Sequence, residues 1–253
     1  MPSLKFYFNL APNPMKVALL LEELELPYEP LPIDTRKGEQ FAPDYLAINP
    51  NGKVPAIVDG DATVFDSNAI LLYLAEKTGR FLPAATPENR GALLSWLMFV
   101  ASGIGPYSGQ AVHFRHFAPE PREYALNRYD FEAERHYRIL ENRLAAGPYI
   151  LGSDYTIVDM AVWGWARLVP HVLGDPQVWQ RFPWIKRLLD EIGARPAILR
   201  PVNLVISRAN REVRGLTFRQ SMDRRKFCGA VGSHRGTRRS TTCPVRGDIE
   251  IAR

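Results

Sequence analysis

The apolar and polar positions of residues 4–33 predict a strand, a helix and a second strand. Leu4–Phe8 is a short apolar and aromatic run, which is typical of a strand. Met15–Leu26 carries apolar residues at most positions and glutamates on another face, which predicts a mostly buried helix. Tyr28–Ile33 predicts a further strand. We place it at a sheet edge because its two prolines cannot donate hydrogen bonds to a neighbouring strand.

Residues 54–79 predict two more strands and a second helix. Val54–Val58 is an apolar strand, and an Asp-Gly-Asp turn leads from it into a returning strand at Ala62–Phe65. Ser67–Thr78 is a helix, with Ser67 as its N-cap and Gly79 as its stop. A β-α-β unit followed by a β-β-α unit is the order of a thioredoxin-like domain with a mixed sheet.

Beyond Pro87 the strand patterns largely disappear and helical periodicity takes over. The pattern predicts helices on either side of an irregular stretch, Gly105–Glu120, which is rich in His, Phe and Pro. These helices are Glu88–Gly103, Glu123–Leu144, Thr156–Leu173 and Pro183–Ile192. We therefore expect an α/β, thioredoxin-like domain at residues 1–82, a linker at 83–87, an all-α helical bundle domain at 88–200, and a disordered tail at 201–253.

Charge separates the tail from the rest of the chain. From Arg200 onward 13 Lys and Arg stand against 4 Asp and Glu, a net charge of +9, whereas the whole chain carries +5. Residues 1–199 therefore carry −4, so the high isoelectric point does not indicate that the whole protein binds nucleic acid.

The basic tail has two interpretations. One is electrostatic attachment to nucleic acid through clusters such as Arg224-Arg225-Lys226. The other is a divergent C-terminus, for instance from a shifted reading frame. We favour the second because the tail lacks a pattern that could fold, so no nucleic-acid partner is predicted for residues 1–200.

Cysteine, histidine and apolar content narrow the class of protein further. Both cysteines, Cys228 and Cys243, lie in the tail, so residues 1–227 contain neither a disulfide nor a protein thiol nucleophile. His113 and His116 have no acidic residue to complete a metal site, so no metal is predicted. No apolar run approaches the roughly 18 residues of a membrane span, and no secretory signal is visible. We expect a cytoplasmic protein that does not enter a membrane.

The strongest local signal is Lys53-Val54-Pro55, where a proline opens an apolar strand after a polar turn. One interpretation is a proline that simply begins a strand. The other is a cis-proline, as thioredoxin-like folds have here. That geometry turns the backbone N–H and C=O of Val54 outward as a half-ladder for a peptide ligand. The thioredoxin-like order of elements favours the second interpretation.

Asp66 and Ser67 begin a helix and present groups suited to a zwitterion. The free N–H groups and the positive end of the helix favour a carboxylate near Ser67, and Asp66 supplies a charge for an ammonium group. The γ-glutamyl end of glutathione carries both of these groups. An ordinary capped helix is the structural alternative.

The turn Ala11-Pro12-Asn13-Pro14 precedes the first predicted helix. Pro14 fits the first helical position and Asn13 fits the N-cap, which accounts for the turn as structure alone. The functional interpretation is that Asn13 also directs an amide donor at a ligand sulfur, since a thiolate at a helix N-terminus has a lowered pKa. Because proline has no N–H, the donors left in the turn are the backbone amides of Ala11 and Asn13 and the Asn13 side chain.

With these motifs, the first 200 residues resemble a bacterial glutathione transferase of the Nu class. They are also similar to the related glutathione-dependent disulfide-bond oxidoreductases and to the yeast prion protein that regulates nitrogen use. The resemblance implies a cytosolic homodimer that uses glutathione as a co-substrate to act on a disulfide or a small-molecule electrophile. The matching stretches are PNPMKVALLLEE, KGEQF, INPNGKVPAIVDGD, DSNAILLYLAEKTGRFLP, GIGPYSGQAVHF, YALNRY and YTIVDMAVW.

The resemblance also implies a site. Asn13 matches the Asn of the family's Thr-Pro-Asn turn and is the candidate catalytic residue, whereas Ala11 replaces the Thr whose hydroxyl contacts sulfur. The implied glutathione-binding residues are Gln40, Lys53, Val54, Pro55, Asp66, Ser67 and Arg128. Because Ala11 lacks the hydroxyl, the alternative function is a glutathione-binding regulatory protein with little or no turnover. A scaffold or translation-associated protein is a third and weaker interpretation.

Two patterns in the helical half are assigned structural roles. Thr156 and Asp159 have the spacing of a capping box, and members of the superfamily share this motif as a folding element. Trp163 and Trp165 lie on an apolar helix and are predicted to belong to the core.

Overall fold

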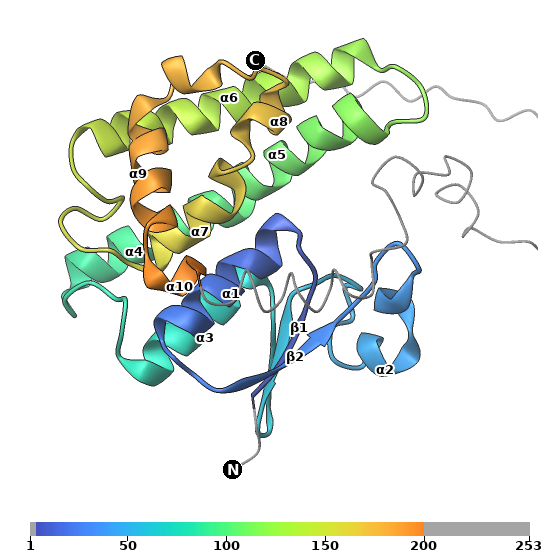
Figure 1. Ribbon diagram of the computed structural model, residues 1–253, viewed down its shortest axis with the longest axis vertical. Coiled ribbons are helices and arrows are strands. Elements are labelled where there is room, and N and C mark those ends of the chain that lie inside the picture. The colour runs from blue at the N-terminus through green and yellow to red at the C-terminus, as the bar shows by residue number, and fades with distance from the viewer. Residues whose placement is uncertain (1–3, 200–253) are drawn as a thin grey trace, which may run out of the picture. The chain divides into compact units, whose positions relative to one another are not determined.

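The computed structural model describes residues 4–199 (Figure 1). The predicted disordered tail at 201–253 lies outside this part of the chain. No helix within residues 4–199 is both long and apolar enough to cross a lipid bilayer.

The first half of the described chain builds a four-stranded mixed sheet with helices packed on it (Figure 1). The strand order is β2-β1-β3-β4, with β1 and β2 parallel and the other two pairs antiparallel. The predicted mixed sheet and the edge position of the second strand are both confirmed. In chain order the elements are β1 (Leu4–Phe8), α1 (Pro12–Glu23), β2 (Tyr28–Pro32), α2 (Pro43–Leu46), β3 (Ala56–Asp59), β4 (Ala62–Phe65) and α3 (Ser67–Thr78), with a 3-10 turn at Glu39–Phe41 before α2.

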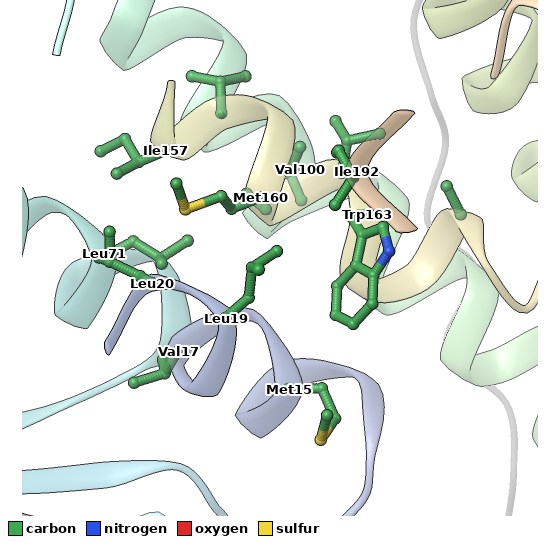
Figure 2. Packing of buried hydrophobic residues seen from close by; sticks show 14 of the residues in the cluster. Met15, Val17, Leu19, Leu20, Leu71, Val100, Ile157, Met160, Trp163 and Ile192 are labelled. Atoms are coloured by element: carbon green, nitrogen blue, oxygen red, sulfur yellow. The ribbon is translucent and has the colours of Figure 1, made fainter. Parts of the chain in front are cut away.

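The core between the sheet and its helices follows from the alternation of side chains along β1. Leu4, Phe6 and Phe8 are buried on one face, as the period of two in a strand requires. The helix α1 is buried along Pro14–Leu21, more than one face of an amphipathic helix, because the sheet and α3 cover one side and α7 (Ile157–Ala166) covers the other. Figure 2 shows side chains of α1, α3 and α7 meeting in one hydrophobic cluster.

The second half of the described chain is helical. Its α-helices are α4 (Pro87–Phe99), α5 (Gly105–Val112), α6 (Glu123–Ala145), α7, α8 (Val169–Leu173), α9 (Pro183–Gly193) and α10 (Pro196–Leu199). Two π-helical segments, η2 (Val100–Ile104) and η3 (His113–Phe117), continue α4 and α5, and a 3-10 turn at Val178–Gln180 precedes α9.

The prediction of an irregular stretch at Gly105–Glu120 is wrong, because the chain stays helical from Pro87 to Phe117. Gly103 lies in the π segment η2, where the ring of His136 packs so closely that a Cβ atom would lie 2.4 Å from His136 Cδ2. Pro106 lies just after η2, so the N–H that it lacks falls where the hydrogen-bond pattern changes from π-helical to α-helical. The glycines and proline that indicated a break instead serve a widened helical turn.

The single helix predicted over Thr156–Leu173 is also wrong, since α7 ends at Ala166 and α8 begins at Val169. Pro170 lies in the first turn of α8, and a proline at this position starts a new helix rather than continuing the old one. The capping box at the start of α7 is confirmed. The Thr156 hydroxyl accepts from the Val158 backbone N–H, and the Asp159 carboxylate accepts from the Thr156 backbone N–H at 2.8 Å.

The two halves meet most closely where α7 crosses α1. At Gly164 a Cβ atom would lie 2.5 Å from Lys16 Cγ and 2.8 Å from the Pro12 carbonyl oxygen. Only a glycine permits this approach of the two helix backbones.

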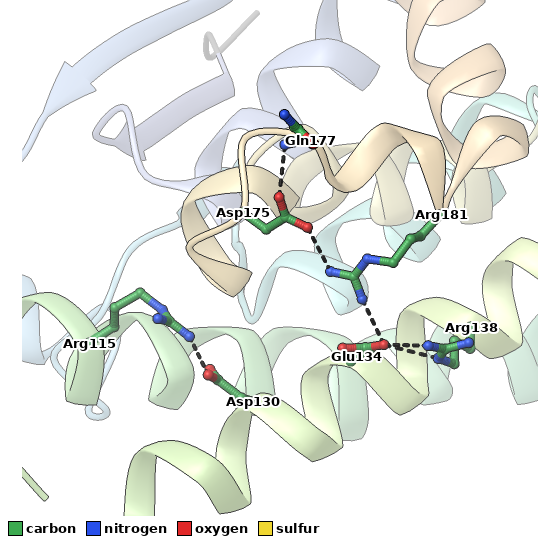
Figure 3. Close-up of polar contacts among 7 residues, drawn as sticks. All are labelled: Arg115, Asp130, Glu134, Arg138, Asp175, Gln177 and Arg181. Atoms are coloured by element: carbon green, nitrogen blue, oxygen red, sulfur yellow. Dashed lines mark hydrogen bonds and ion pairs between the residues drawn. The ribbon is translucent and has the colours of Figure 1, made fainter. Parts of the chain in front are cut away.

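Ion pairs join α6 to η3 and to the segment that follows α8 (Figure 3). Arg181 bridges Glu134 on α6, at 2.8 Å, and Asp175, at 3.0 Å. Arg115 pairs with Asp130 in the same region. These contacts hold the helical bundle together at its surface, and none of the residues in Figure 3 is one of the predicted site residues.

Candidate functional site

The peptide bond between Val54 and Pro55 is cis, as the sequence predicted. The carbonyl oxygen of Lys53 just before it accepts hydrogen bonds from the Tyr45 hydroxyl, at 2.6 Å, and from Asn49 Nδ2, at 2.5 Å. The ladder of β3 with its neighbours begins at Ala56. The backbone groups of Val54 therefore lie beyond the end of the sheet, where an extended ligand can pair with them.

Asp66 and Ser67 lie together at the start of α3, but their capping roles differ from the prediction. Asp66 is the N-cap, and its Oδ1 accepts from the backbone N–H groups of Asn68 and Ala69 at 2.8 and 3.2 Å. Ser67 is the first helical residue, so the prediction of Ser67 as N-cap is wrong. Asp66 takes the N-cap position because its carboxylate accepts hydrogen bonds from two free backbone N–H groups of the first turn.

Asp66 also adopts a backbone conformation that is unusual for its residue type. Its φ angle is 72°, in the region that disfavours side chains with a Cβ atom. Such positions occur at binding and catalytic sites, where surrounding contacts hold the strained residue. Asp66 is exposed whereas the adjacent Ser67 is buried, so the start of α3 combines an exposed acidic residue with a shielded hydroxyl.

The helix α1 likewise begins earlier than predicted, by two residues. Ala11 is the N-cap, Pro12 is the first helical residue and Asn13 is the second, so Asn13 is not the N-cap. Asn9 explains the shift, because its Oδ1 accepts from the Ala11 backbone N–H at 2.9 Å and closes the turn ahead of Pro12. Since the Ala11 amide is already engaged, the donors that remain in this turn belong to Asn13.

The side chain of Asn13 is oriented by a residue of the helical half. Trp165 Nε1 on α7 donates to Asn13 Oδ1 at 3.0 Å. The Trp165 indole lies against Gly105 and Gly109 of α5, within 3.6 Å of where their Cβ atoms would be. Because the amide oxygen of Asn13 is engaged by an indole N–H, its Nδ2 group stays free to donate.

Trp163 and Trp165 were predicted as core residues; this is confirmed for Trp163, whereas Trp165 packs against the core but is only partly buried. Trp163 is buried, whereas Trp165 is half-buried and its indole nitrogen reaches the turn before α1. No periodicity in the sequence could connect Trp165 with Asn13, because the contact depends on how α7 packs across α1.

Gln40 lies in the 3-10 turn before α2 and is 9% exposed. Its Oε1 atom is buried, and no described residue donates a hydrogen bond to it. A buried polar atom without a partner is costly, so this acceptor is suited to a donor on a ligand.

The remaining predicted residues are less closely tied to this region. Lys53 is exposed, and its backbone carbonyl is fixed by Tyr45 and Asn49. Arg128 lies on α6, where its guanidinium donates to Glu132 Oε1 at 2.7 Å, and its side chain is about half exposed. Among the described residues, no hydrogen bond joins Arg128 to the turn before α1 or to the start of α3.

After Trp165, Lys16 is a second residue of this region whose part in the site was missed from the sequence. Lys16 on α1 is 1% exposed, and its Nζ lies 3.4 Å from Ser67 Oγ, so it joins the first turns of α1 and α3. A lysine within the apolar run Met15–Leu21 was the available signal.

Comparisons with known proteins agree with this geometry. A model of the glutathione S-transferase N-terminal domain matches residues 2–76, and a model of the C-terminal domain matches residues 124–191. The chain is 43% identical over 198 residues to the disulfide-bond oxidoreductase YfcG of Escherichia coli, covering 76% of this chain and 90% of that protein. It is 37% identical over 224 residues to the disulfide-bond oxidoreductase YghU of the same organism, covering 82% and 76%.

Solved structures give the same result. A glutathione transferase from Burkholderia graminis, with two glutathione molecules bound per subunit, has a TM-score of 0.73 at 35% identity, covering 79% of this chain and 88% of that one. A glutathione transferase from Phanerochaete chrysosporium in complex with oxidized glutathione has a TM-score of 0.75 at 35% identity, covering 81% and 97%.

Proposed function

The chain belongs to the glutathione S-transferase family, and on that premise we propose that it activates the thiol of bound glutathione to reduce a disulfide or attack an electrophile. The observation that carries this proposal is the Asn13 amide in the first turn of α1, held through its oxygen with its nitrogen free to donate. A sulfur at this point faces both that donor and the positive end of the helix, which together favour the thiolate.

The thiolate supplies the chemistry because residues 1–227 contain no cysteine. In disulfide reduction it attacks one sulfur of the substrate, the substrate S–S bond breaks, and the departing sulfur takes a proton from solvent. A second glutathione then attacks the mixed disulfide, releasing the other substrate thiol and oxidised glutathione. The protein's part is to hold the first sulfur ionised and aligned.

The peptide is held along the edge that leads from the cis-proline to the start of α3. Val54, before Pro55, pairs with its backbone, and Gln40 offers a buried acceptor. Asp66 faces the ammonium of the γ-glutamyl end, and Ser67 donates to its carboxylate. Lys53 and Arg128 are the cations assigned to carboxylates of the ligand.

We also propose the organisation in which this site works. Residues 1–82 form the glutathione-binding domain, 83–87 the linker and 88–200 the helical domain, and the protein acts as a cytoplasmic homodimer. The family resemblance supports the homodimer. The regulatory alternative without turnover is not favoured, because the chain is similar to YfcG and YghU, which are both named disulfide-bond oxidoreductases.

A titration of the purified full chain tests the proposal. Calorimetry with glutathione should show saturable binding, and the ultraviolet absorbance of a thiolate should appear at a pH where free glutathione is still mostly protonated. S-methylglutathione is the matched control, because it should bind without that absorbance. The chain should also reduce 2-hydroxyethyl disulfide with glutathione. Absence of both heat and any change in Tm with glutathione would contradict the proposal.

Replacing Trp165 with phenylalanine should lower kcat about 2–10-fold, which is the effect of one neutral hydrogen bond. Phenylalanine keeps a ring against α5 but removes the N–H that orients Asn13, so the Tm should change little. Trp96→Phe on α4 is the matched control, since Trp96 packs against Phe99. An unchanged rate in Trp165→Phe would show that the indole N–H does not orient the amide.

A further inference from the structure

A buried lysine that the proposed chemistry does not use lies beneath the start of α3. Lys16 is 1% exposed on α1. The stem of its side chain packs against Gly164 of α7, where a Cβ atom would lie 2.5 Å from Lys16 Cγ and 3.0 Å from Cε. Its Nζ makes one hydrogen bond to a described residue, at 3.4 Å to Ser67 Oγ. An ammonium group has three N–H donors, so this arrangement leaves it poorly satisfied.

The contact fixes the direction in which the Ser67 hydroxyl can donate. When Lys16 carries its charge, as in the proposed complex, its ammonium group can only donate, so in that state Ser67 Oγ accepts from Lys16. The hydroxyl hydrogen of Ser67 is therefore directed away from Lys16. Ser67 is the first helical residue of α3, where free backbone N–H groups also favour an anion.

The charge of Lys16 has little compensation within the fold. Burial lowers the pKa of its ammonium to about 7, and the carboxylate of Asp66 acts in the opposite direction. Of the elements packed around Lys16, α3 brings this one acidic group and α7 brings Gly164, which has no side chain. Asp66 is already the N-cap of α3, with Oδ1 accepting from Asn68 and Ala69.

We propose that Lys16 is a positioning residue for the γ-glutamyl carboxylate of glutathione, and that binding of this carboxylate is accompanied by uptake of a proton at Lys16 Nζ. The proton comes from solvent, and no covalent bond is made or broken in the ligand. The proposal rests on the proposed function, because it deepens the role of the Asp66 and Ser67 subsite. The ligand carboxylate adds the negative charge that the buried ammonium lacks.

The sign of the pH dependence follows from the direction of the shift. In the free protein Lys16 is mostly neutral above about pH 7, whereas the unfolded chain keeps this lysine charged up to its ordinary pKa of 10.5. The unfolded state therefore binds more protons in that window, so the unliganded protein gains stability as the pH rises. Binding of the carboxylate needs the charged form, so affinity should fall by up to about tenfold per pH unit above about 7.

The test is calorimetry of the full chain with S-methylglutathione, which has no thiol proton to release. Titrations at about pH 8 in phosphate and in Tris, which differ in ionisation enthalpy, give the number of protons taken up. We expect net uptake of a substantial fraction of one proton. The analogue with a 4-aminobutyryl group in place of γ-glutamyl lacks the carboxylate, and it should bind more weakly and without uptake.

Variants separate the role of charge from that of packing. Lys16→Met keeps the length of the side chain and should abolish proton uptake and weaken S-methylglutathione about tenfold, the effect of a charged hydrogen bond. Lys16→Arg keeps a permanent charge and should recover affinity without uptake. The exposed Lys5→Met on β1 is the control and should match the wild type.

Two negative outcomes are distinguishable. If wild type binds S-methylglutathione with no proton uptake, or prefers it no more than the 4-aminobutyryl analogue, the role of Lys16 is overturned while the proposed function stands. If wild type binds neither S-methylglutathione nor glutathione, the proposed function itself fails. The wild-type titrations decide both questions even if Lys16→Met does not fold.

Discussion

Replacing Asn13 with alanine should lower kcat for glutathione-dependent disulfide reduction by about 10–100-fold, the effect of losing one hydrogen bond to a charged group. The Ala11 amide donates to Asn9, and Pro12 and Pro14 have no N–H, so this turn has no other side-chain donor to offer a sulfur. The pKa of bound glutathione should rise toward that of the free thiol, and the pH–rate profile should move upward with it.

The affinity for S-methylglutathione distinguishes this result from a damaged site. Its Kd should change little in Asn13→Ala, because the peptide is held by groups on the other elements. Asn89→Ala is the matched control, since Asn89 lies in the first turn of α4 and donates to the carbonyl of Ala84. A full rate of disulfide reduction in Asn13→Ala would remove Asn13 from the mechanism.

Replacing Asp159 with alanine should lower the free energy of unfolding by about 3–5 kcal/mol, since buried donors lose their acceptor. Asp159 is fully buried, and its carboxylate accepts from the backbone N–H groups of Ile150 and Thr156, both at 2.8 Å, and from the Thr156 hydroxyl at 3.1 Å. Alanine would leave two backbone N–H groups unpaired in the core, and typical domains have only about 5–15 kcal/mol to lose.

Urea unfolding at about pH 8 measures this loss. Burial raises the pKa of Asp159 to about 6, and the hydrogen bonds it accepts oppose that rise, so the carboxylate is ionised there. Asp190→Ala is the control, because Asp190 is an exposed partner of Lys186 on α9 and its loss should cost less than about 1 kcal/mol. Equal midpoints for Asp159→Ala and wild type would contradict the structural role assigned to the capping box.

The order of the elements was predictable because each signal is local. The bounds of β1, β4 and α3 match the sequence pattern, since alternation in a strand and a glycine stop after a helix act over a few neighbouring residues. The N-caps of the two helices at the site were placed too late, by one residue at α3 and by two at α1. At α3 an aspartate reached two N–H groups ahead of the serine, and at α1 the side chain of Asn9 closed the turn early.

The parts of the site that sequence reasoning missed are made by packing between elements that are far apart in the chain. Trp165 contacts a side chain 152 positions away, and Lys16 contacts one 51 positions away. Neither contact has a signature in spacing or composition, because both depend on α7 lying across α1 and on α1 lying beside α3. The glycines and proline in residues 103–106 led to the wrong prediction of an irregular stretch. A π-helical turn accommodates these residue types there without ending the helix.

The absence of a side chain at Gly164 affects how the protein unfolds. It lets α7 rest directly on the first turn of α1, so the helix that begins the glutathione domain has one of its buried sides inside the other domain. Residues 1–82 expressed alone would expose that apolar side to water and aggregate or stay partly molten. The described residues should therefore melt as one cooperative unit, with the turn before α1 and the helical bundle lost in the same transition.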